Sequence, residues 1–282
     1  MKKIIYLFLL ISVSSFAQEK LTPELLFKLG RVNNPQVSPD AKTVLYEVKK
    51  YDLAANKGTN YIYTVASAGG TPFQVSDDAT NAFDAKWRPD GKKISFLSTI
   101  NSEVQLFEIN LDGSAKTQIT FVKGGIGSYK YAPNLSMIAY SADVKLDRTV
   151  AEQYADLPFV QARIIDGLFY RHWDAWHDYS YSHMFISPYT DGKLAGEATD
   201  IMKEEKYDAP LQPFGGDEQY SWSFDGKMLA YTSKKMTGTP EAVSTNSDIY
   251  IYHLDTKFTQ NLTEQNTGYD QNPQFAPDGK KI

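Results

Sequence analysis

The sequence predicts an all-β fold, a β-propeller of four-stranded blades. Three observations predict it: a repeated turn-and-strand phrase, a spacing of about 40 to 50 residues between most of its copies, and an abundance of aromatic and turn residues. The chain of 282 residues holds 19 Tyr and 15 Phe together with 18 Gly and 13 Pro. Such a composition favours strands and tight turns over helices, and one all-β domain can contain the whole length.

The repeated phrase begins at Pro39, Pro89, Pro133, Phe224 and, incompletely, at Pro277. Its first residues are typical of a tight turn, because Pro fixes φ, Asp or Asn caps its own backbone, and Gly tolerates the left-handed conformation. The residues that follow alternate, so every second side chain shares one face of a strand. Each phrase is therefore predicted to be a hairpin between two strands. Its fifth and seventh positions after the start hold an aliphatic and an aromatic residue: Val44 and Tyr46, Ile94 and Phe96, Ile138 and Tyr140, Leu229 and Tyr231.

A second hairpin follows each phrase, so each repeat supplies four strands. The predicted blades cover about 31–76, 84–121, 128–202 and 219–264, and a fifth begins at 272. The interval from Asn134 to Asp225 is nearly double the others but contains a single outer hairpin, which indicates an insertion at about 142–182 in the third blade. Its first half is predicted to form a short helix that ends or kinks at Pro158, and its second half is rich in aromatic residues.

Residues 1–17 are predicted to be a signal peptide, with Lys2 and Lys3 before a short apolar run and cleavage after Ala17. The run is shorter than the roughly 18 residues that a transmembrane helix needs. The mature protein is therefore expected to be periplasmic or secreted. A net charge of −5 argues against nucleic acid and gives no reason to expect an anionic membrane as partner. The chain has no cysteine and no phosphate-binding loop, and no cofactor is expected.

The aromatic half of the insertion is the candidate substrate-binding surface. The aromatic residues Tyr170, Trp173 and Trp176 supply apolar contact, and Arg171 adds a guanidinium fork that suits carbonyl or carboxylate groups. Tyr170, Arg171 and Trp173 are the leading candidates. The competing interpretation is that Trp173 and Trp176 attach the insertion to its blade. Glu152 and Asp156 are predicted to lie on one face of a helix, where they would accept a substrate amino group. The alternative is that this helix face is solvated and binds nothing.

Two other segments contain acidic or histidine residues that could form a site. The segment 172–178 holds two His and two Asp, but the two His are five positions apart and no third ligand follows at a suitable spacing. An aromatic loop is favoured there, and no metal site is expected. Glu204 and Glu205 are interpreted as a solvated loop between Lys203 and Lys206.

Two stretches resemble a known family. Residues 21–48 (LTPELLFKLGRVNNPQVSPDAKTVLYEV) are similar to the start of the mature propeller in the prolyl oligopeptidase family of secreted serine peptidases. Residues 162–186 (ARIIDGLFYRHWDAWHDYSYSHMFI) resemble the third-blade segment of its dipeptidyl-peptidase V and acylaminoacyl-peptidase branch. The resemblance extends over essentially all of 21–282.

The resemblance implies a propeller that gates and binds peptide substrates, followed by an α/β-hydrolase domain that carries Ser, Asp and His. No G-x-S-x-G occurs in the chain, so no catalytic residue is assigned here. The expected partners are a peptide substrate and a hydrolase domain of the same polypeptide. Four blades and the start of a fifth cannot close a ring, so the chain alone is expected to aggregate or fold poorly. The alternatives from a binding class are a TolB-like periplasmic propeller that docks proteins without catalysis and a glycan-binding propeller.

Overall fold

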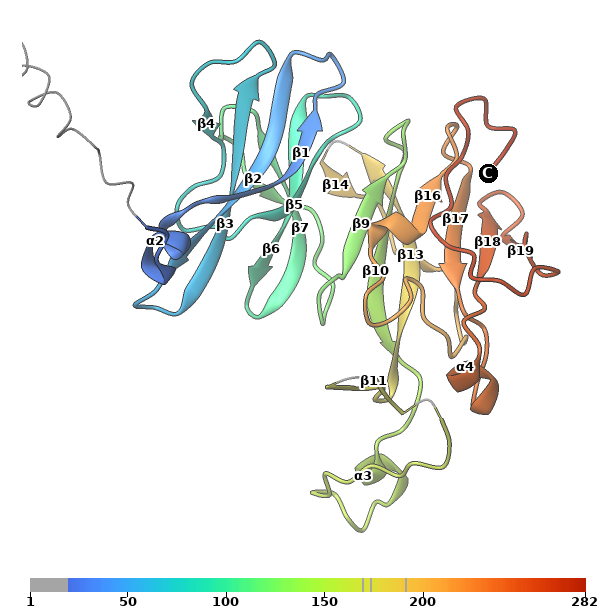
Figure 1. Ribbon diagram of the computed structural model, residues 1–282. Coiled ribbons are helices and arrows are strands. Elements are labelled where there is room, and N and C mark those ends of the chain that lie inside the picture. The colour runs from blue at the N-terminus through green and yellow to red at the C-terminus, as the bar shows by residue number, and fades with distance from the viewer. Residues whose placement is uncertain (1–19, 169, 173, 191) are drawn as a thin grey trace, which may run out of the picture.

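The computed structural model describes residues 20–168, 170–172, 174–190 and 192–282, so the predicted signal peptide at 1–17 lies outside the described residues. Antiparallel sheets follow one another along the chain and form a row, from β1 at the blue end to β19 at the red end (Figure 1). Three of these sheets have four strands in sequential order, and the third sheet along the chain has five. This is the architecture that the repeated phrase predicts.

The strands of the first two sheets are β1 (Arg31–Val37), β2 (Thr43–Asp52), β3 (Lys57–Ala66) and β4 (Phe73–Gln74), then β5 (Phe83–Trp87), β6 (Lys93–Ile100), β7 (Glu103–Asn110) and β8 (Thr117–Gln118). The third sheet comprises β9 (Ser128–Tyr131), β10 (Met137–Lys145), β13 (Ser180–Thr190), β14 (Lys193–Leu194) and β15 (Thr199–Asp200). The fourth comprises β16 (Tyr220–Trp222), β17 (Met228–Ser233), β18 (Asp248–His253) and β19 (Phe258–Asn261). The helices are short: α2 (Pro23–Lys28), α3 (Val150–Gln153), α4 (Thr239–Val243) and a 3₁₀ turn at Asp217–Gln219.

All five copies of the phrase form the same turn. In each one a backbone N–H donates to the carbonyl five residues later, at 2.8 to 3.0 Å: Ser38 to Thr43, Arg88 to Lys93, Ala132 to Met137, Ser223 to Met228, and Ala276 to Lys281. The left-handed position is glycine in three copies, as expected, but Ala41 and Leu135 occupy it with φ of 60° and 58° in the other two. The fifth copy, predicted to begin a blade at 272, contains the turn but no strand within the described residues.

The aliphatic and aromatic positions of the phrase face the preceding sheet. Ile94 and Phe96 of the second sheet pack in one cluster with Leu45 and Ile62 of the first. Ile138 and Tyr140 likewise pack toward the second sheet. The residues at these positions in the fourth sheet, Leu229 and Tyr231, join Met184 and Ile186 of the third. Burial of these repeated side chains between neighbouring sheets supplies the hydrophobic free energy that stabilises the row of sheets.

A cross-strand aromatic pair recurs in every sheet. The aromatic residue of each phrase lies directly opposite an aromatic residue of the next strand, and the two rings stack with centroids 5.4 to 5.7 Å apart. The four pairs are Tyr46 with Tyr63, Phe96 with Phe107, Tyr140 with Phe185, and Tyr231 with Tyr250.

The third-blade insertion is shorter than the predicted 142–182. Strand β10 continues to Lys145 and β13 begins at Ser180, because these two strands pair without interruption up to Lys145 and Ser180. The connection is therefore 146–179. Its helix α3 ends at Gln153, well before Pro158, because Tyr154 leaves the helical conformation and its N–H closes the last turn on Val150.

Candidate functional site

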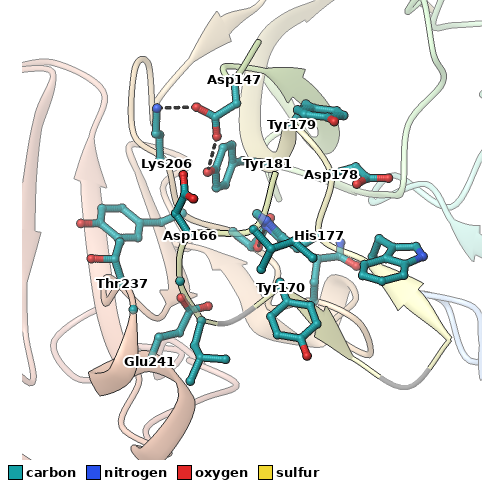
Figure 2. A pocket seen from close by; sticks show the side chains of 18 of the residues that line it. Asp147, Asp166, Tyr170, His177, Asp178, Tyr179, Tyr181, Lys206, Thr237 and Glu241 are labelled. Carbon is teal, nitrogen blue, oxygen red and sulfur yellow. Dashed lines mark hydrogen bonds and ion pairs between the residues drawn. The ribbon is translucent and has the colours of Figure 1, made fainter. Parts of the chain in front are cut away.

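The insertion lies at one end of the third and fourth sheets (Figure 1). Residues of the insertion line a cleft there. The cleft has a volume of about 450 Å³. Three parts of the chain form its walls: the insertion itself, the segment 206–212 that leads to the fourth sheet, and the segment 234–241 that includes the start of α4. Figure 2 shows His177 and Tyr170 of the insertion, Lys206 of the second segment, and Glu241 of the third around this space.

Two smaller cavities, each of about 250 Å³, lie along the same end of the sheets. The first shares Trp176, His177 and Asp208 with the cleft, and it also reaches Asp143 at the end of β10. The second shares Asp143 and Ser182 with the first and extends to the glycine-rich loop 124–127 that precedes β9. We call this series of cavities the groove. It leads from the insertion toward β9, the first strand of the third sheet.

The insertion begins with a capped helix. Thr149 accepts the N–H of Glu152, and the Glu152 carboxylate accepts the N–H of Thr149, which together form a capping box. The Glu152 carboxylate also pairs with Lys145, and the hydrogen bond from Lys145 is the main reason that its pKa falls to about 2. Glu152 is therefore engaged in fixing the start of the insertion, and it does not line the groove among the described residues.

A small aromatic and cationic cluster holds the second half of the insertion together. Strands β11 (Arg171–His172) and β12 (Ala175–Trp176) pair as a short hairpin. Trp176 stacks on Tyr170 with ring centroids 6.1 Å apart. The guanidinium groups of Arg163 and Arg171 lie 4.7 and 5.1 Å from the centroid of the Trp176 ring.

Carboxylates pair with two of the cations that line the cleft, Arg163 and Lys206. Arg163 makes a bidentate pair with Asp178, with both N to O distances 2.6 Å, and this pair lowers the pKa of Asp178. Lys206 pairs with Asp147, which also accepts the hydroxyl of Tyr181 at 2.8 Å (Figure 2). Lys234 donates instead to the backbone carbonyls of Glu241 and Ser244 near the end of α4.

His177 connects the insertion to the segment 206–212. Its Nε2 lies 3.3 Å from one carboxylate oxygen of Asp208, and the other oxygen of Asp208 accepts the backbone N–H of Ser182 at 2.7 Å. The hydrogen bond with Asp208 is the largest cause of the raised pKa of His177, and it outweighs the opposing effect of burial.

The predicted site residues are only partly brought together. Tyr170 lines the cleft, whereas Arg171 contacts Trp176 and is not one of the described lining residues. Trp173 lies outside the described residues. The predicted helix face shared by Glu152 and Asp156 is wrong, because α3 ends at Gln153. Trp176, which the sequence offered both as a substrate-lining residue and as an attachment residue, lines both the cleft and the adjoining cavity.

Sequence reasoning did not single out Asp143 or Asp208, and it considered His177 only as part of a possible metal segment. Asp143 lies near the end of a strand, and Asp208 lies in a loop. No local sequence pattern distinguishes either residue from an ordinary surface carboxylate. Within the ranges that the structure describes, no group of three His, Asp or Glu residues is arranged to hold a metal ion. In the same ranges, no helix combines the length and the apolar character needed to cross a membrane.

Comparison with known proteins gives relatives over nearly the whole chain. No protein-family model matches it. Dipeptidyl-peptidase 5 of Porphyromonas gingivalis is 40% identical over 264 residues, which are 94% of this chain and 38% of that protein. Dipeptidyl-peptidase 5 of Porphyromonas endodontalis is 37% identical over 265 residues, 92% of this chain and 37% of that protein. The predicted family resemblance is confirmed. The chain spans a little over a third of the length of these relatives.

A solved structure confirms the fold. Acylaminoacyl peptidase of Pyrococcus horikoshii superposes with a TM-score of 0.59 over 85% of this chain and 33% of that one, at 16% identity. The predicted all-β propeller architecture therefore agrees both with the sheets of this chain and with a peptidase structure. The superposed sheets match a third of that structure, and within the described residues they include no α/β-hydrolase unit.

Proposed function

We propose that this chain is the substrate-gating and peptide-binding part of an exported serine peptidase that cleaves short peptides from their amino end. The observation that carries the proposal is the groove, which runs from the insertion past Asp143 and whose outer part is walled by aromatic side chains. Export rests on the predicted signal peptide at 1–17. The acyl transfer would belong to a Ser-His-Asp triad in a hydrolase domain of the same polypeptide.

The size of the cleft favours a short peptide over a folded protein as its occupant. Cavities that enclose small ligands have volumes of roughly 300 to 1,000 Å³, and the cleft of about 450 Å³ lies in this range. Tyr170 and Trp176 give it an apolar wall that suits peptide side chains. The insertion forms one wall of the cleft, and this position beside the cleft supports a role in restricting what enters.

Asp143 is the group in the groove that best suits a substrate amino group. Among the described residues its side chain makes neither a hydrogen bond nor an ion pair, and it lies where the two smaller cavities meet. Burial raises the pKa of Asp143, and the nearby charge of Asp208 raises it further. An ammonium group beside Asp143 would relieve both effects, because an opposite charge favours the ionised carboxylate.

The test compares peptide substrates with a free and an acetylated amino end, using the complete gene product. We expect hydrolysis of the free peptide, with acetylation raising KM. The variant Asp143→Asn should raise KM for the free peptide roughly ten-fold or more, since a charge-assisted hydrogen bond contributes about 1.5 to 3 kcal/mol. Asp156→Asn is the matched control, because Asp156 is an exposed carboxylate of the insertion that does not line the groove.

Two results would overturn the proposal. Equal KM values for free and acetylated peptides, with Asp143→Asn behaving like Asp156→Asn, would remove the role in binding the amino end. A complete protein that hydrolyses no peptide but binds other proteins would instead support the docking propeller that the sequence left as an alternative.

A further inference from the structure

The insertion is tied to the segment 206–208 by two charged contacts. Lys206 pairs with Asp147 at the start of the insertion, and Asp208 pairs with His177 near its end. At its base the insertion is closed by backbone hydrogen bonds, because the N–H groups of Leu146 and Asp147 both donate to the carbonyl of Tyr179, at 3.0 and 3.1 Å. The base is therefore fixed as part of the sheet, whereas the position of the outer part over the cleft depends on side-chain contacts.

A histidine is present in one of these charged contacts and not in the other. Burial opposes ionisation of Asp147, but hydrogen bonds from Lys206 and Tyr181 outweigh it and lower the pKa of Asp147, so this carboxylate titrates on the acidic side of neutrality. His177 differs, because an unperturbed imidazole has a pKa of about 6.5. The strength of the contact between His177 and Asp208 therefore changes over the range in which an exported enzyme works.

Acidic groups on three parts of the chain favour the protonated form of His177. Asp208 contacts it from the segment 206–212, Glu241 acts on it from α4, and Asp147 acts on it from the start of the insertion. Asp143 and Asp178 border the same small cavity. The cations that line the same cleft are Arg148, Arg163, Lys206 and Lys234. Arg163 and Lys206 are paired with carboxylates, and the pKa of His177 is raised in the presence of all four.

The ring of His177 also contacts the blade directly. It packs edge-on against Tyr181 of β13, with ring centroids 4.9 Å apart, and the hydroxyl of Tyr181 donates to Asp147. Asp208 is itself fixed, since it accepts the N–H of Ser182 and its carbonyl accepts the hydroxyl of Ser233. The acceptor side of the contact is therefore rigid, and the insertion carries the residue that changes charge.

We propose that the contact between His177 and Asp208 is a pH-sensitive latch that holds the insertion over the cleft when His177 is protonated and releases it when His177 is neutral. The latch rests on the proposed function only in that the cleft is taken as the substrate entrance. The sign follows from the charged pair: the closed form binds the proton more tightly than the open form, so closure is favoured at low pH and lost as pH rises. A released insertion admits larger peptides.

The experiment measures the position of the insertion directly. Donor and acceptor dyes are attached to the complete gene product at Phe159→Cys, on the insertion, and at Thr256→Cys, in the turn between β18 and β19. Both sites are exposed, and residue 159 is 94% exposed. The 282 residues contain no native cysteine, and any cysteine outside them is first replaced by serine. Energy transfer is then recorded from pH 5.5 to pH 9.

We expect one transition with a midpoint above 6.5. His177→Gln should abolish the transition, and Asp208→Asn should move its midpoint to lower pH by on the order of one unit, while the Asn oxygen still accepts the N–H of Ser182. His253→Gln is the matched control and should leave the midpoint unchanged, because His253 ends β18 opposite Met228, away from the 234–247 connection that carries α4. If His177→Gln fails to fold, the shift of the transition midpoint in Asp208→Asn tests the latch by itself.

A transfer efficiency that stays constant with pH, a transition that persists in His177→Gln, or an unshifted midpoint in Asp208→Asn would overturn the latch. The measurement needs no substrate, so its result is separate from that of the peptide test. Movement of the insertion without cleavage from the amino end would contradict the proposed function and leave the latch intact. The size preference is read from the KM of peptides of increasing length at pH 6 and pH 8.5, where the latch predicts a smaller penalty for long peptides at the higher pH.

Discussion

His183 lies 2.8 Å through its Nδ1 from the carboxylate of Asp200, while its Nε2 lies 2.7 Å from the carbonyl of Glu205. A carbonyl only accepts, so Nε2 carries a proton, and an ionised Asp200 favours a second proton on Nδ1. The side chain of His183 is fully buried between the third sheet and the segment that follows it. The buried ring of His183 thus joins β13 to β15 and to the loop after β15.

The arrangement predicts a stability that depends on pH. Burial lowers the pKa of His183, but the hydrogen bonds with Asp200 and Glu205 outweigh it, so the net pKa is raised. Because the folded-state pKa lies above the unfolded value of about 6.5, this contribution is fully present below pH 6.5 and is lost as pH rises through the folded pKa. The difference in unfolding free energy between wild type and His183→Gln, from urea melts at pH 5.5 to pH 9, should shrink as pH rises. A difference in unfolding free energy that stays constant from pH 5.5 to pH 9 would contradict this role of His183.

The left-handed turn positions predict a pair of opposite effects. Ala41 adopts a φ of 60° on an exposed turn, a conformation that costs a residue with a Cβ roughly 1 kcal/mol relative to glycine. Ala41→Gly should therefore stabilise the protein by about 0.5 to 1 kcal/mol. Gly91→Ala, at a φ of 69° in the equivalent turn, should destabilise it by a similar amount. Its added Cβ would meet Pro39 at 3.4 Å, an ordinary contact, so backbone strain alone is tested. Thermal or urea melts that shift in the same direction for both variants would refute this reasoning.

The stacked aromatic pairs predict a large cost for one truncation. Phe96 is fully buried between the first and second sheets and stacks on Phe107. Phe96→Ala should lower the unfolding free energy by about 3 to 5 kcal/mol, because it removes apolar contacts and leaves a cavity. Phe73→Ala is the control, since Phe73 on β4 is 49% exposed, and it should cost less than about 1 kcal/mol. Similar costs for both would show that the phrase does not form the interface between the sheets.

A buried carboxylate predicts a further weak point between the second and third sheets. Glu108 of β7 is fully buried and accepts the hydroxyls of Tyr131 and Tyr189, and Arg88 lies 3.2 Å from its other oxygen. Glu108→Ala should destabilise the protein by about 3 to 5 kcal/mol, because it leaves two hydroxyls without their acceptor and removes one of the two carboxylates that Arg88 contacts. Glu108→Gln keeps most of the shape and should cost less. Urea melts that rank the two variants in the reverse order would contradict this assignment.

The repeated phrase shows how far the sequence alone determined the fold. The turn residues and the aliphatic and aromatic positions at fixed offsets are local features, and they were sufficient to predict every phrase hairpin in the first four sheets. They also predicted an insertion in the third blade, since the interval there is too long for one blade. The helix within the insertion was predicted too long, because its end is set by a single residue, Tyr154, and not by the downstream proline.

The candidate site was decided by the tertiary structure. Asp143, His177 and Asp208 are separated by more than thirty residues at each step, and nothing in the local sequence distinguishes them from surface residues. They meet because β10 and β13 pair up to Lys145 and Ser180, and because the segment after the third sheet folds back beside them. Glu152 shows the converse: its sequence suggested an amino-group acceptor, but a capping box and Lys145 occupy its carboxylate. Local periodicity fixes which residues form strands and turns, whereas the charge and access of a side chain depend on neighbours that only the packed sheets supply.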